Sequence, residues 1–177
     1  MRRITLITTG GTMEKEYDER SGALVNRRSV VDRMLRRLRL EEVAIVPMEL
    51  MHKDSLELTD EDRSLIVSAT KNALSNAAGE SDDSRRGVVI VHGTDTLALT
   101  GECLHEQLGS LRWPVVLTGA MRPYELQRSD SVQNLTEALF ATDLLEAGVW
   151  AVAHGRALRF PGVVKDRDRG TFVKPVS

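Results

Sequence analysis

Two turns rich in glycine and threonine carry the side chains best suited to chemistry in this chain. The segment T-T-G-G-T at residues 8–12 follows the apolar run 4–7, and H-G-T-D-T at residues 92–96 follows the apolar run 88–91. Each run resembles a buried strand, and open α/β sheets bind ligands at the carboxyl ends of their strands. Hydroxyls from both turns and a carboxylate from the second would then share one cleft. This pattern favours nucleophilic chemistry over a phosphate cradle.

Both turns also have purely structural interpretations. Gly10 and Gly11 could simply allow a tight turn, because glycine tolerates positive φ. A nucleotide site is not indicated, since G-x-G-x-x-G and Gly-Lys-Ser/Thr are both missing here. The segment 94–96 could cap the following helix, because Thr and Asp favour that position. Alternatively, Asp95 could orient or accept a proton, and the backbone N–H groups at the helix start could stabilise an oxyanion.

A threonine hydroxyl is a weak nucleophile that needs a basic partner. Lys165 is the best candidate to couple with Thr94 and Asp95, because the apolar pair Val163-Val164 just before it could carry it back to the cleft. The alternative is an ordinary surface lysine, because the residues that follow, 166–169, are all charged.

Composition excludes several other classes. The 4 histidines lack metal-ligand spacing, so they do not indicate a metal site, and G-x-S-x-G does not occur, so Ser/His/Asp hydrolysis is not favoured. A net charge of −2 gives no global field for nucleic acid or an anionic membrane. The single cysteine, Cys103, cannot form an internal disulfide, and the apolar run after Arg2-Arg3 is too short for a signal peptide or membrane span. These features predict a cytoplasmic protein.

The elements that must position these side chains alternate along the chain. Apolar runs predict strands at 4–8, 43–47, 88–91, 114–117 and 149–153. Helical spacing and capping residues predict helices at 29–39, from Thr59 onward, at 96–108 and from about 130 to 145. We expect irregular loops at 10–26 and 79–86, and a loop or hairpin followed by a tail from 154 to 177. This alternation predicts a single α/β domain over 1–177, with a mainly parallel sheet covered by helices on both faces.

Four segments, in order, resemble those of the bacterial-type L-asparaginases, amidohydrolases with a threonine nucleophile. These segments are T-G-G-T-M at 9–13, H-G-T-D-T at 92–96, G-A-M-R-P at 119–123 and V-V-K at 163–165. Any one of them would be a weak signal, but together they span nearly the whole chain. The resemblance implies a flavodoxin-like sheet.

The resemblance also implies roles for individual residues. Thr12 would attack a side-chain amide, and Thr94, Asp95 and Lys165 would form a second catalytic group. Tyr17 would orient the nucleophilic threonine. Ser55, with Gly11 and Gly93, would bind the substrate. The implied reaction converts L-asparagine to L-aspartate and ammonia without a metal or cofactor.

Two departures from the family keep other functions open. Leu56 stands where the family often has Gln or Ser, and leucine cannot hydrogen-bond the α-substituents of an amino acid. The chain also resembles short members that lack the second domain, so either a homo-oligomer supplies the missing groups, which is the expected assembly, or the site binds its substrate loosely. Glutamine or a larger amide is therefore an alternative substrate, and a non-catalytic binding module is a third possibility because fold does not dictate function.

Overall fold

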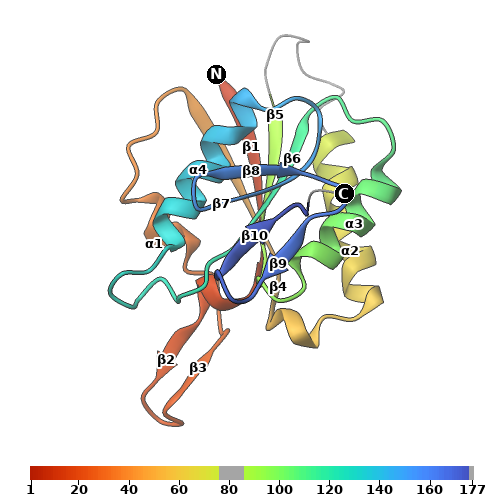
Figure 1. The fold of residues 1–177 in the computed structure, drawn as a ribbon. Helices are drawn as coiled ribbons and strands as arrows, with labels where there is room; N and C mark the ends of the chain where they lie inside the picture. The colour runs from red at the N-terminus through yellow and green to blue at the C-terminus, as the bar shows by residue number, and fades with distance from the viewer. Residues whose placement is uncertain (76–85, 176–177) are drawn as a thin grey trace.

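The structure, a computed structural model, describes residues 1–75 and 86–175 and centres on a six-stranded sheet of order β4-β1-β5-β6-β7-β8 (Figure 1). The strands are β1 (Arg2–Gly10), β4 (Val43–Lys53), β5 (Arg86–Val91), β6 (Pro114–Thr118), β7 (Gly148–Ala153) and β8 (Arg156–Arg159). All pairs are parallel except β7 with β8, which is antiparallel. The predicted mainly parallel α/β sheet is thus confirmed.

Helices cover both faces of this sheet. They are α1 (Val31–Leu35), α2 (Asp60–Ser75), α3 (Leu97–Leu108) and α4 (Ser131–Leu144). Alternate residues of β1 face opposite layers, as the pleat of a strand requires. Ile7 belongs to one buried cluster with Ile66 of α2 and Leu104 of α3, whereas Leu6 belongs to another with Leu135 of α4. Figure 1 shows α2 and α3 on one side of the sheet and α1 and α4 on the other.

The sheet reverses its direction of growth between β1 and β5. From β1 the chain moves outward to β4 and then crosses back to β5 on the other side of β1. Thr8 of β1 lies opposite Val91 of β5, so both glycine-threonine turns leave adjacent strand ends. Such a switch point is where open α/β sheets form their ligand sites.

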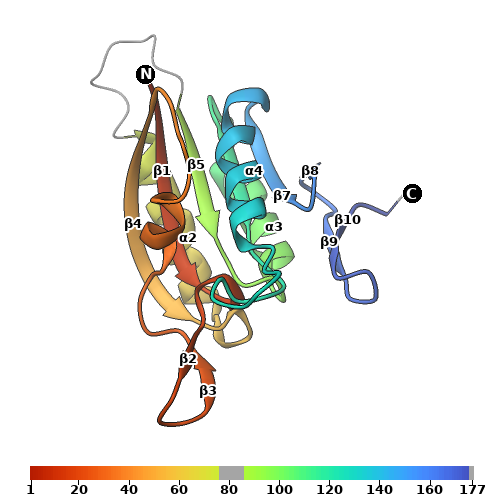
Figure 2. The ribbon, with the colours of Figure 1, turned by 90° about the vertical axis from the view of Figure 1, so that its left-hand side faces the viewer.

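The expectation of an irregular loop over 10–26 was wrong. A short 3₁₀ turn, η1 (Thr12–Glu14), is followed by a hairpin of β2 (Glu16–Asp18) and β3 (Ala23–Val25). The Asp18 carboxylate accepts hydrogen bonds from Ser21 Oγ at 2.7 Å and Arg20 N at 3.3 Å, and Gly22 takes a φ of 68°. These local bonds stabilise the turn without apolar alternation. Figure 2 shows the hairpin projecting from the body.

Two predicted boundaries also differ from the structure. The helix predicted at 29–39 begins after Ser29, whose Oγ accepts from Val31 N, but it ends at Leu35. The chain then continues in tighter turns, with Arg37 N bonded to Met34 O. The strand predicted at 43–47 continues to Lys53. A proline at position 47 is tolerated because β4 is an edge strand, paired only with β1.

The segment predicted as a loop or hairpin followed by a tail contains the short strands β8, β9 and β10 within the described residues 154–175. His154 (φ 54°) and Gly155 (φ 73°) form the turn between β7 and β8, and a hairpin of β9 (Val164–Asp166) and β10 (Thr171–Val173) follows. Positive φ at both central residues suits a two-residue hairpin turn. Figure 2 shows the β9–β10 hairpin on the β8 side of the molecule.

The remaining helices lie close to their predicted positions. Thr59 and Asp62 form the predicted capping box, with Thr59 N bonded to Asp62 Oδ2 at 3.0 Å and Asp62 N to Thr59 Oγ1 at 3.3 Å. The charged loop predicted at 79–86 lies outside the described residues except for Arg86, which begins β5. In the described part of the chain, no helix combines the length and apolar character needed to cross a membrane.

Candidate active site

Three turns meet at the switch point with their backbones in contact. A Cβ atom added to Gly11 (φ 80°) would lie 2.4 Å from both N and Cα of Gly93, and one added to Gly93 would lie 2.5 Å from Cβ and Oγ of Ser55. No side chain fits at either glycine, so both turns require glycine for close approach, and the first turn requires it for the positive φ of Gly11 as well. Thr12 and Thr94 each follow one of these touching glycines. The structure therefore brings the two candidate hydroxyl residues to one place.

Lys165 joins the second turn directly. Its Nζ donates to Thr94 Oγ1 at 2.8 Å and to Asp95 Oδ1 at 3.0 Å. Its side chain is only 15% exposed, which excludes the solvated surface lysine that the neighbouring charges had suggested. Thr94 is buried and Asp95 is one-quarter exposed. Hydroxyl, ammonium and carboxylate form a continuous chain along which a proton can move.

The β9–β10 hairpin holds Lys165 in this position. Val163, just before β9, is buried, and Lys165 lies opposite Phe172 of β10, which is also buried in the core. Two apolar anchors thus fix a short hairpin whose other side chains are largely polar. Arg167 lies two residues after Lys165, and its Nη1 also contacts Asp95 Oδ1 at 3.0 Å. Arg167 was missed from the sequence, because it follows β9 within the charged run 166–169 and no pattern there distinguishes it.

The buried ring of His92 links the second turn to α3 through two hydrogen bonds. Its Nδ1 lies 2.8 Å from Gly93 O, so this nitrogen carries the proton, and its Nε2 accepts from Thr100 Oγ1 at 2.8 Å. Burial lowers the pKa of His92 to about 4, with Arg63 adding to this and the bond to Gly93 opposing it. A neutral imidazole therefore braces the turn against α3.

Thr96 does not cap α3 with its side chain, in contrast to the capping interpretation of the second motif. It occupies the N-cap position but makes no side-chain bond to the helix. Its Oγ1 instead donates to Ser55 O at 2.8 Å. The second turn is thereby tied to η2 (Ser55–Glu57) rather than to its own helix.

Ser55 itself is buried against Gly93. The Asp54 carboxylate starts η2 by accepting from Leu56 N at 3.1 Å, and it pairs with Lys15 Nζ at 2.6 Å. The hydrogen bond from Lys15 holds the pKa of Asp54 below its usual value despite the opposing effect of burial. This ion pair links the first turn to the Ser55 turn. Leu56 is 68% exposed beside them.

Tyr17 lies apart from this group. It belongs to β2 of the projecting hairpin, with 58% of the residue exposed. Its hydroxyl would be the nearest atom, at 3.9 Å, to a Cβ added to Gly22 of the same hairpin. Its backbone N donates to the Glu125 carboxylate.

The G-A-M-R-P segment is held by a polar network that was not found from the sequence. The Asp130 carboxylate accepts from Met121 N and Arg122 N at 2.9–3.1 Å and contacts His154 Nε2 at 2.7 Å. The other ring nitrogen of His154 lies 2.9 Å from Thr171 Oγ1 of β10. Burial raises the pKa of Asp130, but these donors together outweigh it and the pKa lies below the usual value. His154 therefore connects this loop to the hairpin that carries Lys165. In the sequence, the only sign of a special position for His154 was the glycine that follows it, which indicates a turn.

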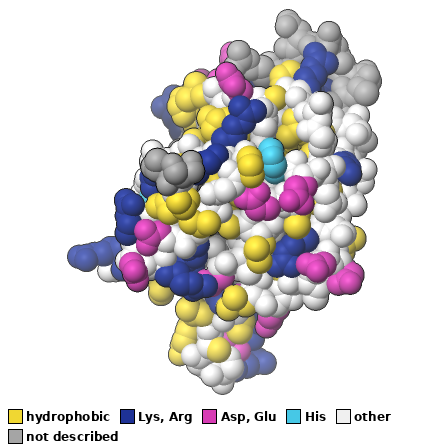
Figure 3. Space-filling model, turned by 45° about the vertical axis from the view of Figure 1, so that its right-hand side comes forward, with side chains coloured by type: hydrophobic (Ala, Val, Ile, Leu, Met, Phe, Trp, Pro, Cys, Tyr) yellow, Lys and Arg dark blue, Asp and Glu magenta, His cyan; other side chains and the backbone are white. Residues whose placement is uncertain are grey.

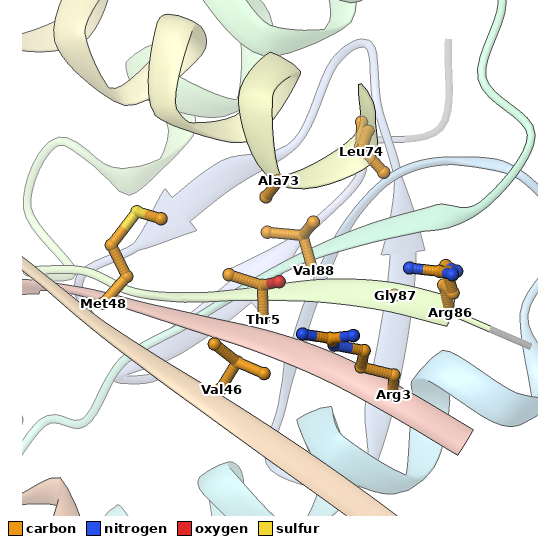
Figure 4. Close-up of a pocket in the computed structure, with 9 residues that line it drawn as sticks. All are labelled: Arg3, Thr5, Val46, Met48, Ala73, Leu74, Arg86, Gly87 and Val88. Carbon is orange, nitrogen blue, oxygen red and sulfur yellow. The ribbon is translucent and has the colours of Figure 1, made fainter. Parts of the chain in front are cut away.

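Other features of the described residues lie away from this site. Within 1–75 and 86–175, no cluster of three or more His, Cys, Asp or Glu side chains could hold a metal ion. A cavity of about 110 Å³ lies at the amino ends of the strands, where Thr5, Val46 and Val88 of neighbouring strands face Ala73 and Leu74 of α2 (Figure 4). It is at the opposite end of the sheet from Thr12. Figure 3 shows basic and acidic side chains interspersed over the face it presents.

The fold and the site together define an α/β protein of flavodoxin-like sheet order, in which two touching glycine–threonine turns and a lysine–carboxylate pair lie at the switch point. Comparison with known proteins makes the assignment more specific. Residues 3–170 match the family model described as "Asparaginase, N-terminal", and the chain belongs to the asparaginase family.

Similar proteins share the domain but are longer. A glutamyl-tRNA(Gln) amidotransferase subunit from Thermoplasma acidophilum is 33% identical over 152 residues, which cover 84% of this chain and 35% of that protein. The thermostable L-asparaginase of Thermococcus kodakarensis is 29% identical with a TM-score of 0.76, covering 92% of this chain and 47% of that one. A probable cytoplasmic L-asparaginase from Campylobacter jejuni shares the fold, with a TM-score of 0.79 at 24% identity over 99% of this chain and 52% of that one. This chain spans 35% of the first of these relatives and 47% and 52% of the two solved chains.

Proposed function

We propose that this protein is an amidohydrolase that converts L-asparagine to L-aspartate and ammonia, with Thr12 as the nucleophile. The observation that carries the proposal is the bridge from Lys165 Nζ to Thr94 Oγ1 and Asp95 Oδ1, at 2.8 and 3.0 Å. A lysine held between a buried hydroxyl and a carboxylate is the basic partner that a threonine nucleophile needs. The bridge lies next to the turn that carries Thr12.

The proposed reaction proceeds in two halves. Thr12 Oγ attacks the side-chain amide carbon, the C–N bond breaks, and the proton from the hydroxyl leaves with the amine as ammonia. Water then attacks the resulting ester, its proton returns to Thr12, and L-aspartate is released. In both halves Thr94 relays the proton between the reacting groups and Lys165, which accepts it in its amine form and returns it in its ammonium form, and Asp95 stabilises that ammonium. The backbone N–H of Thr94 would stabilise the oxyanion.

Substrate binding is proposed for Gly11, Gly93 and Ser55, whose close contact supports one continuous surface. The orienting role of Tyr17 stays a prediction, and its exposure on the projecting hairpin gives it no support. The proposed location is the cytoplasm, and the proposed assembly is a homo-oligomer, which light scattering on the purified chain would test.

A different amide is the second candidate substrate. Leu56, 68% exposed beside Ser55, presents an apolar side chain where an amino acid would need hydrogen-bond donors or acceptors. The 33% identical relative from Thermoplasma acidophilum is named for glutamyl-tRNA(Gln) amidotransfer, so glutamine and larger amides belong in the same test.

The decisive test is ammonia release from a panel containing L-asparagine, L-glutamine and N-acetyl-L-asparagine. We expect L-asparagine to react fastest and Thr12→Ala to abolish the reaction while the variant remains folded. If another amide reacts faster, that amide becomes the proposed substrate and the proposed mechanism is unchanged. Saturable binding of an amide without ammonia release would make the protein a binding module and overturn the proposal.

A further inference from the structure

A buried carboxylic acid lies next to the proposed nucleophile and has no role in the reaction as written. Glu14 ends the 3₁₀ turn that begins at Thr12, and it is 0% exposed. Its Oε2 accepts from Gly10 N at 2.9 Å, and its Oε1 accepts from Ser29 Oγ. Within 1–75 and 86–175, no lysine, arginine or histidine forms a salt bridge with this carboxylate. A buried acid without a cation is costly, so its retention next to the site calls for a reason.

The bond from Gly10 N closes a ring around the nucleophile. The ring runs from the backbone of Gly10 through Gly11, Thr12 and Met13 to the side chain of Glu14. Inside it, Glu14 N bonds to Gly11 O at 3.1 Å, so backbone and side chain of the same residue both hold the turn. Gly10 and Gly11 have φ values of 97° and 80°, in the left-handed region where glycine is flexible. The Glu14 side chain therefore restrains the two positive-φ glycines that precede Thr12.

The surroundings allow Glu14 to change its protonation state near neutral pH. Burial is the largest influence and raises the pKa of Glu14 to about 7, whereas the bonds from Ser29, Gly10 and Val30 N oppose the rise. The negative charge of Glu49 on β4 raises the pKa of Glu14 further, whereas the hydrogen bonds from the Gly10 backbone of β1 and from Ser29 and Val30 before α1 lower it. The ionised form makes the stronger bond to Gly10 N, because charge-assisted hydrogen bonds are about twice as strong as neutral ones.

We propose that Glu14 is a positioning residue for Thr12, whose carboxylate fixes the Gly10–Gly11 turn and so sets the direction of the threonine hydroxyl. This inference rests on the proposed amidohydrolase function. Misplacement of a reacting group by about 1 Å can lower the rate by about a hundredfold, so loss of this restraint should be visible in turnover.

The test compares Glu14→Ala with the isosteric Glu14→Gln in the full chain, with Glu106→Gln on the exposed side of α3 as the control. The glutamine oxygen can still accept from Gly10 N, and its amino group can donate to Ser29 Oγ. With the best amide substrate, Glu14→Ala should lower kcat at least about tenfold with KM changed less than about threefold, by the same misplacement estimate. Glu14→Gln should restore most of that turnover and remove the inflection near pH 7 from the kcat profile. Wild-type kcat in Glu14→Ala, or an unchanged inflection in Glu14→Gln, would overturn the proposal.

An independent readout separates this proposal from the proposed function. The amide NMR resonances of Gly10 and Thr12 should titrate with pH near 7 in the wild type, should not do so in Glu14→Gln, and should shift or broaden in Glu14→Ala. If these resonances behave as expected but no amide is hydrolysed, the proposed reaction fails and the restraint on the turn stands. Resonances of Gly10 and Thr12 that are the same in all three proteins would refute the restraint, whatever the activity.

Discussion

Replacing Lys165 by methionine keeps the length of the side chain but removes its charge and both of its hydrogen bonds at the site. These bonds join Nζ to Thr94 Oγ1 at 2.8 Å and to Asp95 Oδ1 at 3.0 Å. Loss of a general acid–base group lowers rates by about 10² to 10⁴. We therefore expect a loss of turnover of at least about a hundredfold.

The stability of Lys165→Met should change much less than its activity. Removing one partner of a fully buried ion pair costs about 3–5 kcal/mol, because a charge is left unpaired. That does not apply here, since Arg167 Nη1 remains 3.0 Å from Asp95 Oδ1 and the Asp95 side chain is 25% exposed. A loss of about 1 kcal/mol in the free energy of unfolding is expected, as for exposed pairs.

Ammonia release under saturating substrate measures the first effect, and urea unfolding measures the second. Lys174→Met is the matched control, because this exposed lysine lies in the same C-terminal segment and its Nζ donates only to Arg159 O among the described residues. It should keep wild-type turnover. Turnover in Lys165→Met close to the wild-type level would refute the proton-transfer role, and unfolding of the variant would refute the stability estimate.

Three further perturbations probe the turns and the hairpin. Gly11→Ala should abolish activity and lower the free energy of unfolding by several kcal/mol, because the new Cβ would lie 2.4 Å from the Gly93 backbone. Gly22→Ala is the control: its Cβ would lie 3.9 Å from the nearest atom, at a φ of 68°. It should lower the free energy of unfolding, measured in urea, by only about 1 kcal/mol. The folded-state pKa of Glu14 is raised from 4.5 to about 7, so its contribution to stability is fully present below pH 4.5 and is lost as the pH rises through about 7. Unfolding free energies should therefore fall by at most about 3 kcal/mol over this range, and Glu14→Gln should remove the fall. His154→Ala should loosen the β9–β10 hairpin and lower turnover severalfold, with faster amide exchange at Phe172 than in the wild type.

The sheet and the major helices were predictable because their signals are local and repeated. Residues 88–91 are continuously apolar, as a strand buried on both faces requires, and Thr59 with Asp62 forms a cap that is legible in sequence. The β2–β3 hairpin was not predictable from apolar periodicity, since polar bonds around Asp18 and the conformation of Gly22 stabilise its turn. The end of α1 at Leu35 was not predictable from the helical spacing, because the chain continues beyond it in tighter turns, with Arg37 N bonded to Met34 O.

The candidate site could be predicted only where a motif marked it. The contact between Gly11 and Gly93 follows from the strand order, which places β1 beside β5. Arg167 and His154 contact segments distant in sequence, and Glu14 contacts Gly10 of its own turn and Ser29 beyond it. No local pattern in the sequence distinguishes these three residues from ordinary polar surface residues. Glu14 is the clearest case, because an acid flanked by Met13 and Lys15 gives no sequence signal of complete burial.

The most direct test of the central claim is to identify the atom that carries the acyl group during turnover. Wild-type protein mixed with L-asparagine, or with the best amide of the panel, is quenched in acid within the first turnovers, digested and analysed by mass spectrometry. We expect an ester on Thr12, with a mass equal to the substrate minus ammonia, that accumulates to a higher level in Lys165→Met than in Lys174→Met. Ammonia release with the adduct on Thr94, or with no adduct under conditions that preserve a threonine ester, would contradict the role of Thr12 as nucleophile.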